Sequence, residues 1–429
     1  MNIVMLTNTY TPHVGGVARS VEAFTAEYRR RGHRVLVVAP EFASQPQDET
    51  DVVRIPAIQN FNGSDFSAVL PVSGLLTEAL DAFRPDLVHS HHPYLLGMTA
   101  LRVARYRKLP LVFTHHTLYE QYTHYVPGDS PGFRRFVIEL ATRYANLCDQ
   151  VFAPSESIAA LLRERGVEAP VAVVPTGVNV ERFARGDGPG FRRRMGIPGN
   201  AFVAGHLGRL APEKNLVFLA EAVVSFLKTA PRAHFLLVGK GSSEADMRAI
   251  FERAGLSERM HVAGNLEPPQ LADAYHAMDV FVFASKSETQ GMVLTEAMAA
   301  CVPVVGLDAP GVREVVKDRR NGRLLHEETA EAFASALQWV AGLPCPKRQE
   351  LKQCARATAE DFSMPCSADT ALACYEVLRA RTLADRTAED AQWERVLHLI
   401  KAEWDILKGL ADAAGAVFGG SQPQDGGLR

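Results

Sequence analysis

Short apolar runs rich in β-branched residues alternate with helical patterns along most of the chain. In its first part, six such runs fit buried strands, and they cover residues 3–6, 34–39, 87–89, 111–114, 150–153 and 171–174. Buried strands that alternate with helices are typical of a parallel sheet whose strands are joined by crossover helices. The pattern therefore predicts an α/β domain built on a parallel sheet.

The same alternation starts again in the second part, with apolar runs at residues 202–207, 233–238, 260–263, 280–284 and 303–305. Between the two parts, residues 175–190 contain Gly and Pro and read as a connection. We therefore expect an N-terminal domain over residues 1–182 and a second α/β domain over residues 183–365. Ligands of open parallel sheets bind beyond the carboxyl ends of the strands, so two such domains facing each other would enclose a cleft.

The C-terminal part follows a different pattern. We expect residues 366–418 to form helices that cross back to the N-terminal domain and continue as an amphipathic extension, followed by a disordered tail over residues 419–429. In the extension, apolar residues recur at three- and four-residue spacing from Trp393 through Trp404 to Leu407. We favour docking of this stripe on the body of the protein, and contact with a membrane or another subunit is the alternative.

Composition and charge narrow the function classes. The chain has 429 residues, of which 47% are hydrophobic, and this is enough for two cores. A formal net charge of -3 gives no basic field that would draw the protein onto nucleic acid, so any attraction to an anionic membrane must be local. The six cysteines lack metal-ligand spacing, which favours free thiols in a reducing cytosol. Without a signal peptide or an apolar window of about 20 residues, we expect a cytoplasmic protein.

A glycine pair follows the first predicted strand. Gly15 and Gly16 stand where a helix is expected to begin. Glycine lets the backbone come close to a ligand, and a helix N-terminus attracts an anion, so a phosphate fits here. A glycine turn without a ligand explains these residues equally well, because no complete dinucleotide or phosphate-loop fingerprint is present.

Two cations follow the first strand of the second domain. Arg209 and Lys214 lie in the stretch G-R-L-A-P-E-K-N. A diphosphate leaving group gains negative charge as a glycosidic bond breaks, and fixed Arg and Lys donors stabilise this charge. No Asp-x-Asp follows a strand where a sugar-nucleotide metal would usually be held, so we expect no metal cofactor. Solvated surface charge is the alternative interpretation of the two cations.

Two carboxylates flank the start of a helix after the fourth strand of the second domain. Gly291 is expected to open this helix, so that the free N–H groups of Met292 and Val293 can hold a phosphate. Glu288 precedes the helix, and Glu296 lies just over one turn beyond its start. Carboxylates accept hydrogen bonds from neighbouring hydroxyls, which suits a ribose beside Glu296 and a hexose beside Glu288. On spacing alone, an acid–base pair of the glycosidase kind is also conceivable.

Histidines gather at two strand ends of the first domain. His115 and His116 follow one strand, and His89, His91 and His92 lie at the end of the strand before it. A lone histidine at such a place is more often structural than catalytic. The second group has no carboxylate or cysteine partner, which does not favour a metal site.

These residues together resemble those of retaining glycosyltransferases of family GT4, whose GT-B fold has two Rossmann-like domains facing each other across a cleft. The likeness runs from residue 1 to about residue 380, and its most specific parts are a G-R-L-x-x-x-K-N stretch and an E-x7-E stretch. The resemblance implies a nucleotide-sugar donor as substrate. The positions that it implies for donor binding are Gly16, Arg209, Lys214 and, for the ribose, Glu296, and the two helix starts add Gly15, Gly291, Met292 and Val293 as donor-binding candidates.

The resemblance also implies the chemistry. Glu288 would contact the donor sugar, and His116, rather than His115, would lie near the transferred sugar and the acceptor, so these two residues are the catalytic candidates. The implied reaction retains the anomeric configuration through a same-face, internal-return-like path, in which the departing phosphate assists deprotonation of the acceptor. The chain departs from the family at Cys301, where Gly is usual, and Thr176-Gly-Val-Asn179 varies the usual Asn-Gly-Val-Asp.

Residues 114–127 are similar to the segment beside the acceptor entrance of bacterial diacylglycerol glucosyltransferases. This likeness implies transfer of glucose from UDP-glucose to 1,2-diacylglycerol for membrane glycolipid synthesis, by a protein peripheral to the inner face of the cell membrane. Aromatic and basic groups in one stretch suit a lipid–water interface, although tyrosines also pack on ordinary domain surfaces. A basic helix end over residues 102–108 lies nearby in the sequence. The residues expected at the acceptor or membrane are Tyr119, Tyr122, Tyr125, Arg134 and Arg135.

Other functions fit the same pattern. The transferase could use a soluble acceptor, such as a sugar phosphate, a polyol or a polysaccharide. A nucleotide-sugar-binding protein without turnover is a second alternative, but it would have no need of His116. A nucleotide-sugar epimerase of the same architecture is a third.

Overall fold

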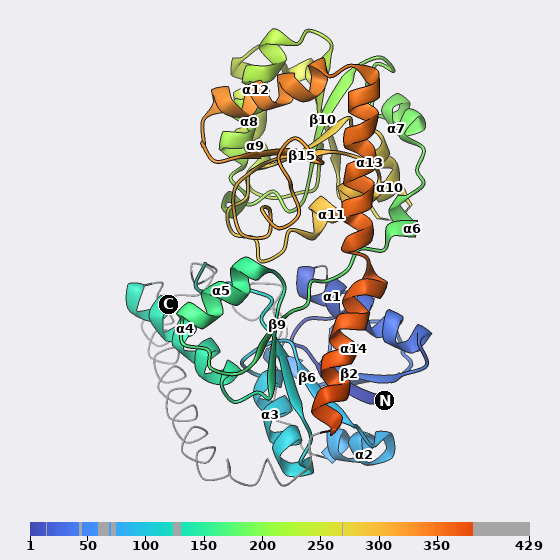
Figure 1. The fold of residues 1–429 in the computed structure, drawn as a ribbon, viewed down its shortest axis with the longest axis vertical. Helices are drawn as coiled ribbons and strands as arrows, with labels where there is room; N and C mark the ends of the chain where they lie inside the picture. Colours follow the sequence, from blue (N-terminus) through green and yellow to red (C-terminus); the bar gives the residue numbers. More distant parts are fainter. Residues whose placement is uncertain are drawn as a thin grey trace, which may run out of the picture.

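The computed structural model describes residues 1–13, 15–42, 45–58, 68–69, 74–121, 123, 130–267 and 269–380. It has two α/β domains stacked along the long axis of the molecule, with the N-terminal domain below in Figure 1. The predicted amphipathic extension, including Trp393 and Trp404, and the predicted tail lie outside the described residues.

Over the described residues, the N-terminal domain has a seven-stranded sheet in which every neighbouring pair is parallel. In spatial order its strands are β3 (Val52–Ile55), β2 (Arg34–Pro40), β1 (Asn2–Leu6), β6 (Leu87–Ser90), β7 (Leu111–Thr114), β8 (Gln150–Ala153) and β9 (Val171–Val173). A separate antiparallel pair joins β4 (Ala57–Ile58) to β5 (Ala68–Val69). The helices are α1 (Gly16–Arg30), α2 (Gly74–Phe83), α3 (Leu96–Arg107), η2 (Tyr119–Gln121), α4 (Pro131–Ala145) and α5 (Glu156–Glu164).

The C-terminal domain has a six-stranded parallel sheet, again counted over the described residues. In spatial order its strands are β12 (Met260–Gly264), β11 (Ala233–Val238), β10 (Phe202–Leu207), β13 (Val280–Phe283), β14 (Val304–Leu307) and β15 (Gly322–Leu325). Its helices of seven residues or more are α7 (Gly188–Arg194), α8 (Leu216–Thr229), α9 (Glu244–Arg253), α10 (Gln270–His276), α11 (Met292–Ala299), α12 (Ala330–Gly342) and α13 (Cys345–Asp361). The shorter ones are α6 (Val180–Phe183), η4 (Pro212–Lys214) and η5 (Ser257–Arg259).

Both sheets have the strand order of a doubly wound fold. The order reverses between β1 and β6 in the first sheet and between β10 and β13 in the second. Ligands bind outside the carboxyl ends of the strands at such a switch point. The loops after these four strands contain the predicted site residues Gly15, Lys214 and Glu288, together with His91, so the topology places these residues at the two switch points.

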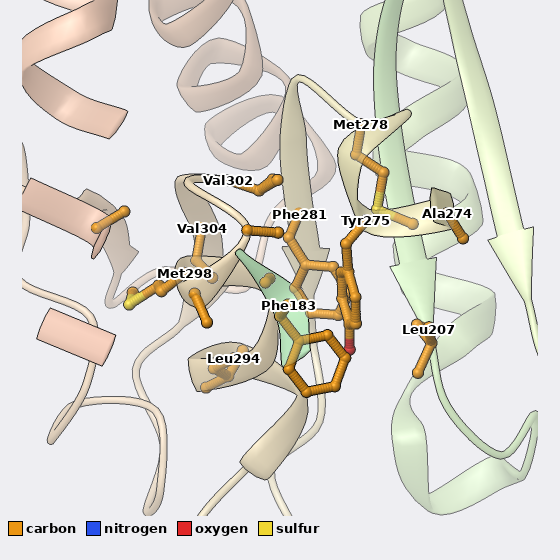
Figure 2. Close-up of a cluster of buried hydrophobic side chains, with 14 of the residues drawn as sticks. Phe183, Leu207, Ala274, Tyr275, Met278, Phe281, Leu294, Met298, Val302 and Val304 are labelled. Atoms are coloured by element: carbon orange, nitrogen blue, oxygen red, sulfur yellow. The ribbon is translucent and has the colours of Figure 1, made fainter. Parts of the chain in front are cut away.

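An apolar layer lies on each face of each sheet. In the N-terminal domain, residues of α2, α3, α4 and α5 form the layer on one face, and α1 and α14 (Met364–Ala380) form the other. In the C-terminal domain, α8, α9 and α12 cover one face, and α7, α10, α11 and α13 cover the other. Figure 2 shows part of this last cluster, in which Phe183, Tyr275 and Phe281 pack together.

The chain passes between the domains twice, and the two passages lie side by side. The Val178 N–H donates to the Phe362 carbonyl and the Met364 N–H donates to the Val178 carbonyl, both at 2.9 Å. A methyl group on Gly177 would lie 2.3 Å from the Met364 Cα atom, so only glycine allows this close approach. After the second passage, α14 packs on α1 of the N-terminal domain, whereas α13 lies along the C-terminal domain (Figure 1).

Two further observations concern the described residues. None of their helices is both long enough and apolar enough to cross a membrane. The six cysteines, all of which are described, are free.

Candidate active site

Two helix N-termini meet where the domains face each other. The residue before α1 is Gly15, which is extended, and the residue before α11 is Gly291, which has a left-handed φ of 71°. Neither residue provides a side-chain cap, in contrast to Ser130 at α4 and Ser155 at α5. A methyl group added at Gly16 would lie 3.6 Å from Met292 Cε. The unpaired N–H groups and positive ends of two helices therefore face one place, which is suited to an anion such as a diphosphate.

The predicted cations follow the neighbouring strand β10, and both are paired with carboxylates. Lys214 Nζ lies 2.5 Å from Glu288 Oε1, and both side chains are mostly buried. Arg209 pairs with Glu213, and its side chain is half exposed. The structure thus brings Lys214 and Glu288 into direct contact, although they are predicted to bind different parts of the donor.

Glu296 is held from both domains. The Tyr275 hydroxyl donates to Glu296 Oε2 at 2.7 Å, and Arg19 Nη1 on α1 of the N-terminal domain lies 4.0 Å from Oε1. Tyr275 is in turn fixed by its ring contacts with Phe183 and Phe281 (Figure 2). Burial raises the pKa of Glu296, while Arg19 and the hydrogen bond from Tyr275 act in the opposite direction.

His116 lies at the carboxyl end of β7 and is half-buried. Its Nε2 atom is 2.9 Å from Nδ1 of His91, and its carbonyl oxygen accepts a 2.8 Å hydrogen bond from the Thr289 hydroxyl of the C-terminal domain. Burial, and then the neighbouring histidines, holds the pKa of His116 well below its ordinary value. The imidazole is therefore neutral at physiological pH. His115 belongs to the opposite face of the sheet, where its ring meets Phe113 and Tyr119 edge-on.

The loop between β13 and α11 is hydrogen-bonded to the N-terminal domain. The Gln290 side chain accepts from the Thr176 N–H at 2.7 Å and donates to the Thr176 carbonyl at 2.6 Å. The Ser155 hydroxyl donates to the Thr289 carbonyl at 2.7 Å. Because Glu288 and Gly291 belong to this loop, closure of the two domains sets their position relative to His116.

The residues predicted at the acceptor or the membrane do not lie together. Arg134 and Arg135 are exposed on the first two turns of α4, beside the stacked rings of Phe133 and Phe136. Tyr119 differs from the prediction of a lipid-facing residue, because η2 turns it into the core, where it packs edge-on against Tyr94. Tyr122 and Tyr125 lie outside the described residues.

The basic helix end at residues 102–108 is not beside the site. It is the C-terminal half of α3, which begins near the carboxyl end of β6 and runs back to the amino edge of the sheet. At that edge Arg107 pairs with Asp81 of α2.

Several residues near the predicted ones were not found from the sequence. They are Arg19, Thr176, Tyr275, Thr289 and Gln290, and His91 had been considered only as a metal ligand. Thr289 and Gln290 lie inside the E-x7-E stretch, directly after Glu288, and this position in the sequence could have indicated that they lie near the site. Among the described residues, no three His, Cys, Asp or Glu side chains are grouped so that they could hold a metal ion.

Two protein families match the chain, one for each domain. Residues 14–182 match Glycosyltransferase Family 4, and residues 189–358 match Glycosyl transferases group 1. A GDP-mannose-dependent alpha-mannosyltransferase of Mycobacterium tuberculosis is 30% identical over 396 residues, which cover 89% of this chain and 98% of that protein. The alpha-monoglucosyldiacylglycerol synthase of Streptococcus pneumoniae is 27% identical over 338 residues, which cover 76% of each chain.

A solved structure has the same architecture. Anabaena HepE in complex with UDP and glucose superposes with a TM-score of 0.69 at 21% identity, over 89% of this chain and 100% of that chain. Likeness at this level of identity concerns the fold. It confirms the predicted GT-B arrangement of two Rossmann-like domains.

Proposed function

Because this chain belongs to glycosyltransferase family 4 and has the GT-B fold, we propose that it transfers glucose from UDP-glucose to 1,2-diacylglycerol with retention of configuration. Glycosyl transfer is the activity of the family. The donor, the acceptor and the residue roles are our proposal.

The observation that carries the proposal is the meeting of two uncapped helix N-termini beside Lys214, Glu288 and Glu296. A diphosphate placed between Gly15 and Gly291 receives N–H groups from both helices, and Lys214 and Arg209 add charge-assisted donors. These donors stabilise the charge that develops as the glycosidic bond breaks. We expect Lys214 to exchange its contact with Glu288 for a phosphate, which frees Glu288 to accept from the hydroxyls of the sugar.

His116 and the diphosphate have different roles in the transfer step. A neutral His116 can donate or accept a hydrogen bond beside the transferred sugar without introducing a charge that would compete with Lys214. The departing phosphate oxygen takes the proton of the acceptor hydroxyl on the same face of the sugar that the acceptor attacks. Lys214 and the helix ends hold this oxygen in position, so the sugar keeps its configuration.

A lipid acceptor is supported by one relative and one surface. The pneumococcal relative is named a monoglucosyldiacylglycerol synthase. In this chain, the N-terminal end of α4 presents Arg134 and Arg135 to solvent beside Phe133 and Phe136. Exposed arginines next to aromatic rings suit an anionic membrane surface, and we propose that this end of α4 brings the protein to the inner face of the cell membrane as a peripheral protein.

The activity test uses purified protein with radiolabelled UDP-glucose and vesicles with or without 1,2-diacylglycerol. We expect a labelled glycolipid only when diacylglycerol is present, at a rate that a metal chelator does not lower. A labelled soluble product from a sugar phosphate or a polyol, without glycolipid, would overturn the lipid acceptor and retain the transferase.

GDP-mannose is the second candidate donor. The relative with this donor in its name matches 89% of this chain, more than the pneumococcal synthase does. Parallel incubations with labelled GDP-mannose decide between the two donors, because the preferred donor should give the higher kcat/KM with the same acceptor.

Membrane contact is tested by vesicle flotation. Replacing Arg134 and Arg135 by Gln should reduce flotation with anionic vesicles, because each basic residue near the surface contributes about 1 kcal/mol. The matched control replaces Arg102 and Arg105 by Gln at the opposite edge of the sheet and should float like the parent protein. Equal loss in both variants would contradict a specific role for α4.

A further inference from the structure

A row of three imidazole rings connects His116 with the last described helix. The rings of His89 and His91 lie 4.2 Å apart between centroids, and those of His91 and His116 lie 5.2 Å apart. At the far end of the row, the Tyr375 hydroxyl of α14 lies 2.6 Å from Nδ1 of His89. His89, His91 and Tyr375 are buried. The row therefore joins the acceptor side of the site to a helix that arrives from the other domain.

The proton positions at the far end follow from the hydrogen bonds. The Tyr28 hydroxyl donates to the Tyr375 oxygen, which leaves the Tyr375 proton free to donate to Nδ1 of His89. His89 then carries its own proton on Nε2, which lies 2.7 Å from the Thr114 hydroxyl. Both nitrogens of His89 are thus satisfied, and its ring is held in one orientation against His91.

A single proton lies between His91 and His116. Burial keeps both rings neutral, so each ring has one N–H and one lone pair. If His116 donated from Nε2, the proton of His91 would lie on its own Nε2, which has no partner among the described residues. If His91 donates from Nδ1, its unpartnered Nε2 bears only a lone pair. Buried N–H groups without an acceptor are rarer than buried acceptors without a donor, so the second arrangement is favoured.

We propose that His91 is a positioning residue for His116. It donates from Nδ1 to Nε2 of His116, which fixes His116 as the tautomer with its proton on Nδ1, while His89 and Tyr375 hold His91 in place. His116 then acts on the sugar or the acceptor as a hydrogen-bond donor. The inference rests on the proposed glycosyl transfer only for its kinetic consequence, and the tautomer itself is independent of that function.

The C-terminal domain contains a second histidine pair with the same geometry, which lies away from the candidate site. His234 Nδ1 lies 2.9 Å from His261 Nε2, the same atoms at the same distance as in the His91–His116 pair. His234 is the second residue of β11, at the amino end of the strand and away from the loops that carry the site. The change His234→Leu therefore controls for the loss of a histidine pair as such.

The kinetic test compares three replacements of His91. His91→Leu removes the donor, and we expect kcat to fall about 10-fold, as for other residues that orient a functional histidine, with little change in UDP affinity. His91→Asn keeps an amide donor close to the position of Nδ1 and should restore most of kcat. His91→Asp offers only an acceptor, which would select the other tautomer of His116 and leave kcat low. Tyr375→Phe should fall between the parent and His91→Leu.

The structural test is nitrogen NMR of protein labelled at its 14 histidines, with the signals of His116 assigned by their loss in His116→Gln. We expect the proton on Nδ1 of His116 in the parent and in His234→Leu, and a mixture of tautomers in His91→Leu. A proton on Nε2 in the parent, an unchanged His116 signal in folded His91→Leu, or unchanged kcat in that variant would overturn the proposal. If no acceptor is turned over by the parent, the proposed function fails, while the NMR result still decides the role of His91.

Discussion

At the residue scale, Glu296 has the most completely defined surroundings of the predicted donor-binding groups. It is 12% exposed, it accepts from Tyr275, and it faces Arg19 from the opposite domain. We expect Glu296→Ala to weaken UDP binding at least 10-fold, because hydrogen bonds to a charged group contribute about 1.5–3 kcal/mol each. Tyr275→Phe removes a hydrogen bond that orients Glu296 but leaves the carboxylate in place, so only part of the binding energy, about 1 kcal/mol, should be lost and UDP binding should weaken about fivefold.

Titration calorimetry with UDP measures both effects. Glu221→Ala, which changes an exposed glutamate on α8 of the same domain, is the control and should bind UDP like the parent. Parent-like affinity in Glu296→Ala would contradict its assignment to the ribose.

Cys301 is a second residue of interest, because its backbone conformation costs free energy in the folded protein. It follows α11 with a φ of 59°, the left-handed region, and its N–H donates to the Met298 carbonyl. A side chain in this region costs roughly 1–2 kcal/mol, and the family usually has Gly here. We expect Cys301→Gly to raise the free energy of unfolding by about 1 kcal/mol after the larger entropy of Gly in the unfolded chain is subtracted. Urea unfolding measures this change, and Cys301→Ala, which keeps the Cβ atom, should not be stabilised.

The candidate site residues that the sequence indicates most directly share one short stretch. Glu288, Gly291 and Glu296 follow one strand, and their helix begins where Gly291 was expected to open it. His91 and Tyr275 lie 25 and 21 residues from the side chains that they contact, and their roles depend on how neighbouring elements pack. Such partners follow from strand register and helix docking, which a hydrophobic pattern does not specify.

At the scale of elements, the strands missed by the hydrophobic pattern are mainly edge strands. Each of the 11 predicted runs overlaps a strand, whereas β3, β15 and the short pair β4 and β5 were not predicted. Edge strands are half exposed and need no continuous apolar run: Arg54 interrupts β3, and Gly322 and Arg323 interrupt β15. Gly322 is required by packing, because a Cβ atom there would lie 1.9 Å from the Val304 carbonyl oxygen.

The loop between β13 and α11 couples the donor site to domain closure. Gln290 contributes two hydrogen bonds to Thr176 of the connecting segment. At about 1 kcal/mol each, their loss in Gln290→Ala should shift the balance between closed and open domains roughly 30-fold towards open and lower kcat. X-ray scattering of the ligand-free protein should show a larger radius of gyration. Gln338→Ala removes a glutamine side-chain hydrogen bond between α12 and α8 within one domain, and it should leave kcat and the radius of gyration unchanged.

At the scale of the whole molecule, the second passage between the domains completes the N-terminal core. Met364, Leu372 and Tyr375 of α14 belong to the apolar layer that α1 forms on the sheet. The N-terminal domain therefore depends on residues that follow the entire C-terminal domain in the sequence. This dependence also places the His89 contact of Tyr375 under the control of how the two domains are joined.

The described part of the molecule also buries several neutral histidines, which predicts a steep acid dependence of stability. Burial lowers the pKa of His89, His92 and His115 to about 3 and that of His206 to about 4. Below pH 6.5, the ordinary value, the unfolded chain takes up protons that the folded protein excludes. The stability contributed by these groups is therefore complete above pH 6.5 and is lost as the pH falls towards 4.

Each such histidine lowers the free energy of unfolding by about 1.4 kcal/mol per pH unit across this range. Urea unfolding between pH 7 and 5 should therefore show an uptake of at least three protons, in a range above the titration of most carboxylates. His206 stacks on Phe281 and Phe283, so His206→Phe should reduce the uptake by about one proton. Phe283→Leu disturbs the same stack without a titrating group and should lower stability equally at every pH. Stability that is flat from pH 7 to 5 would mean that the buried histidines become protonated without unfolding, and the neutral His91–His116 pair would then lose its basis.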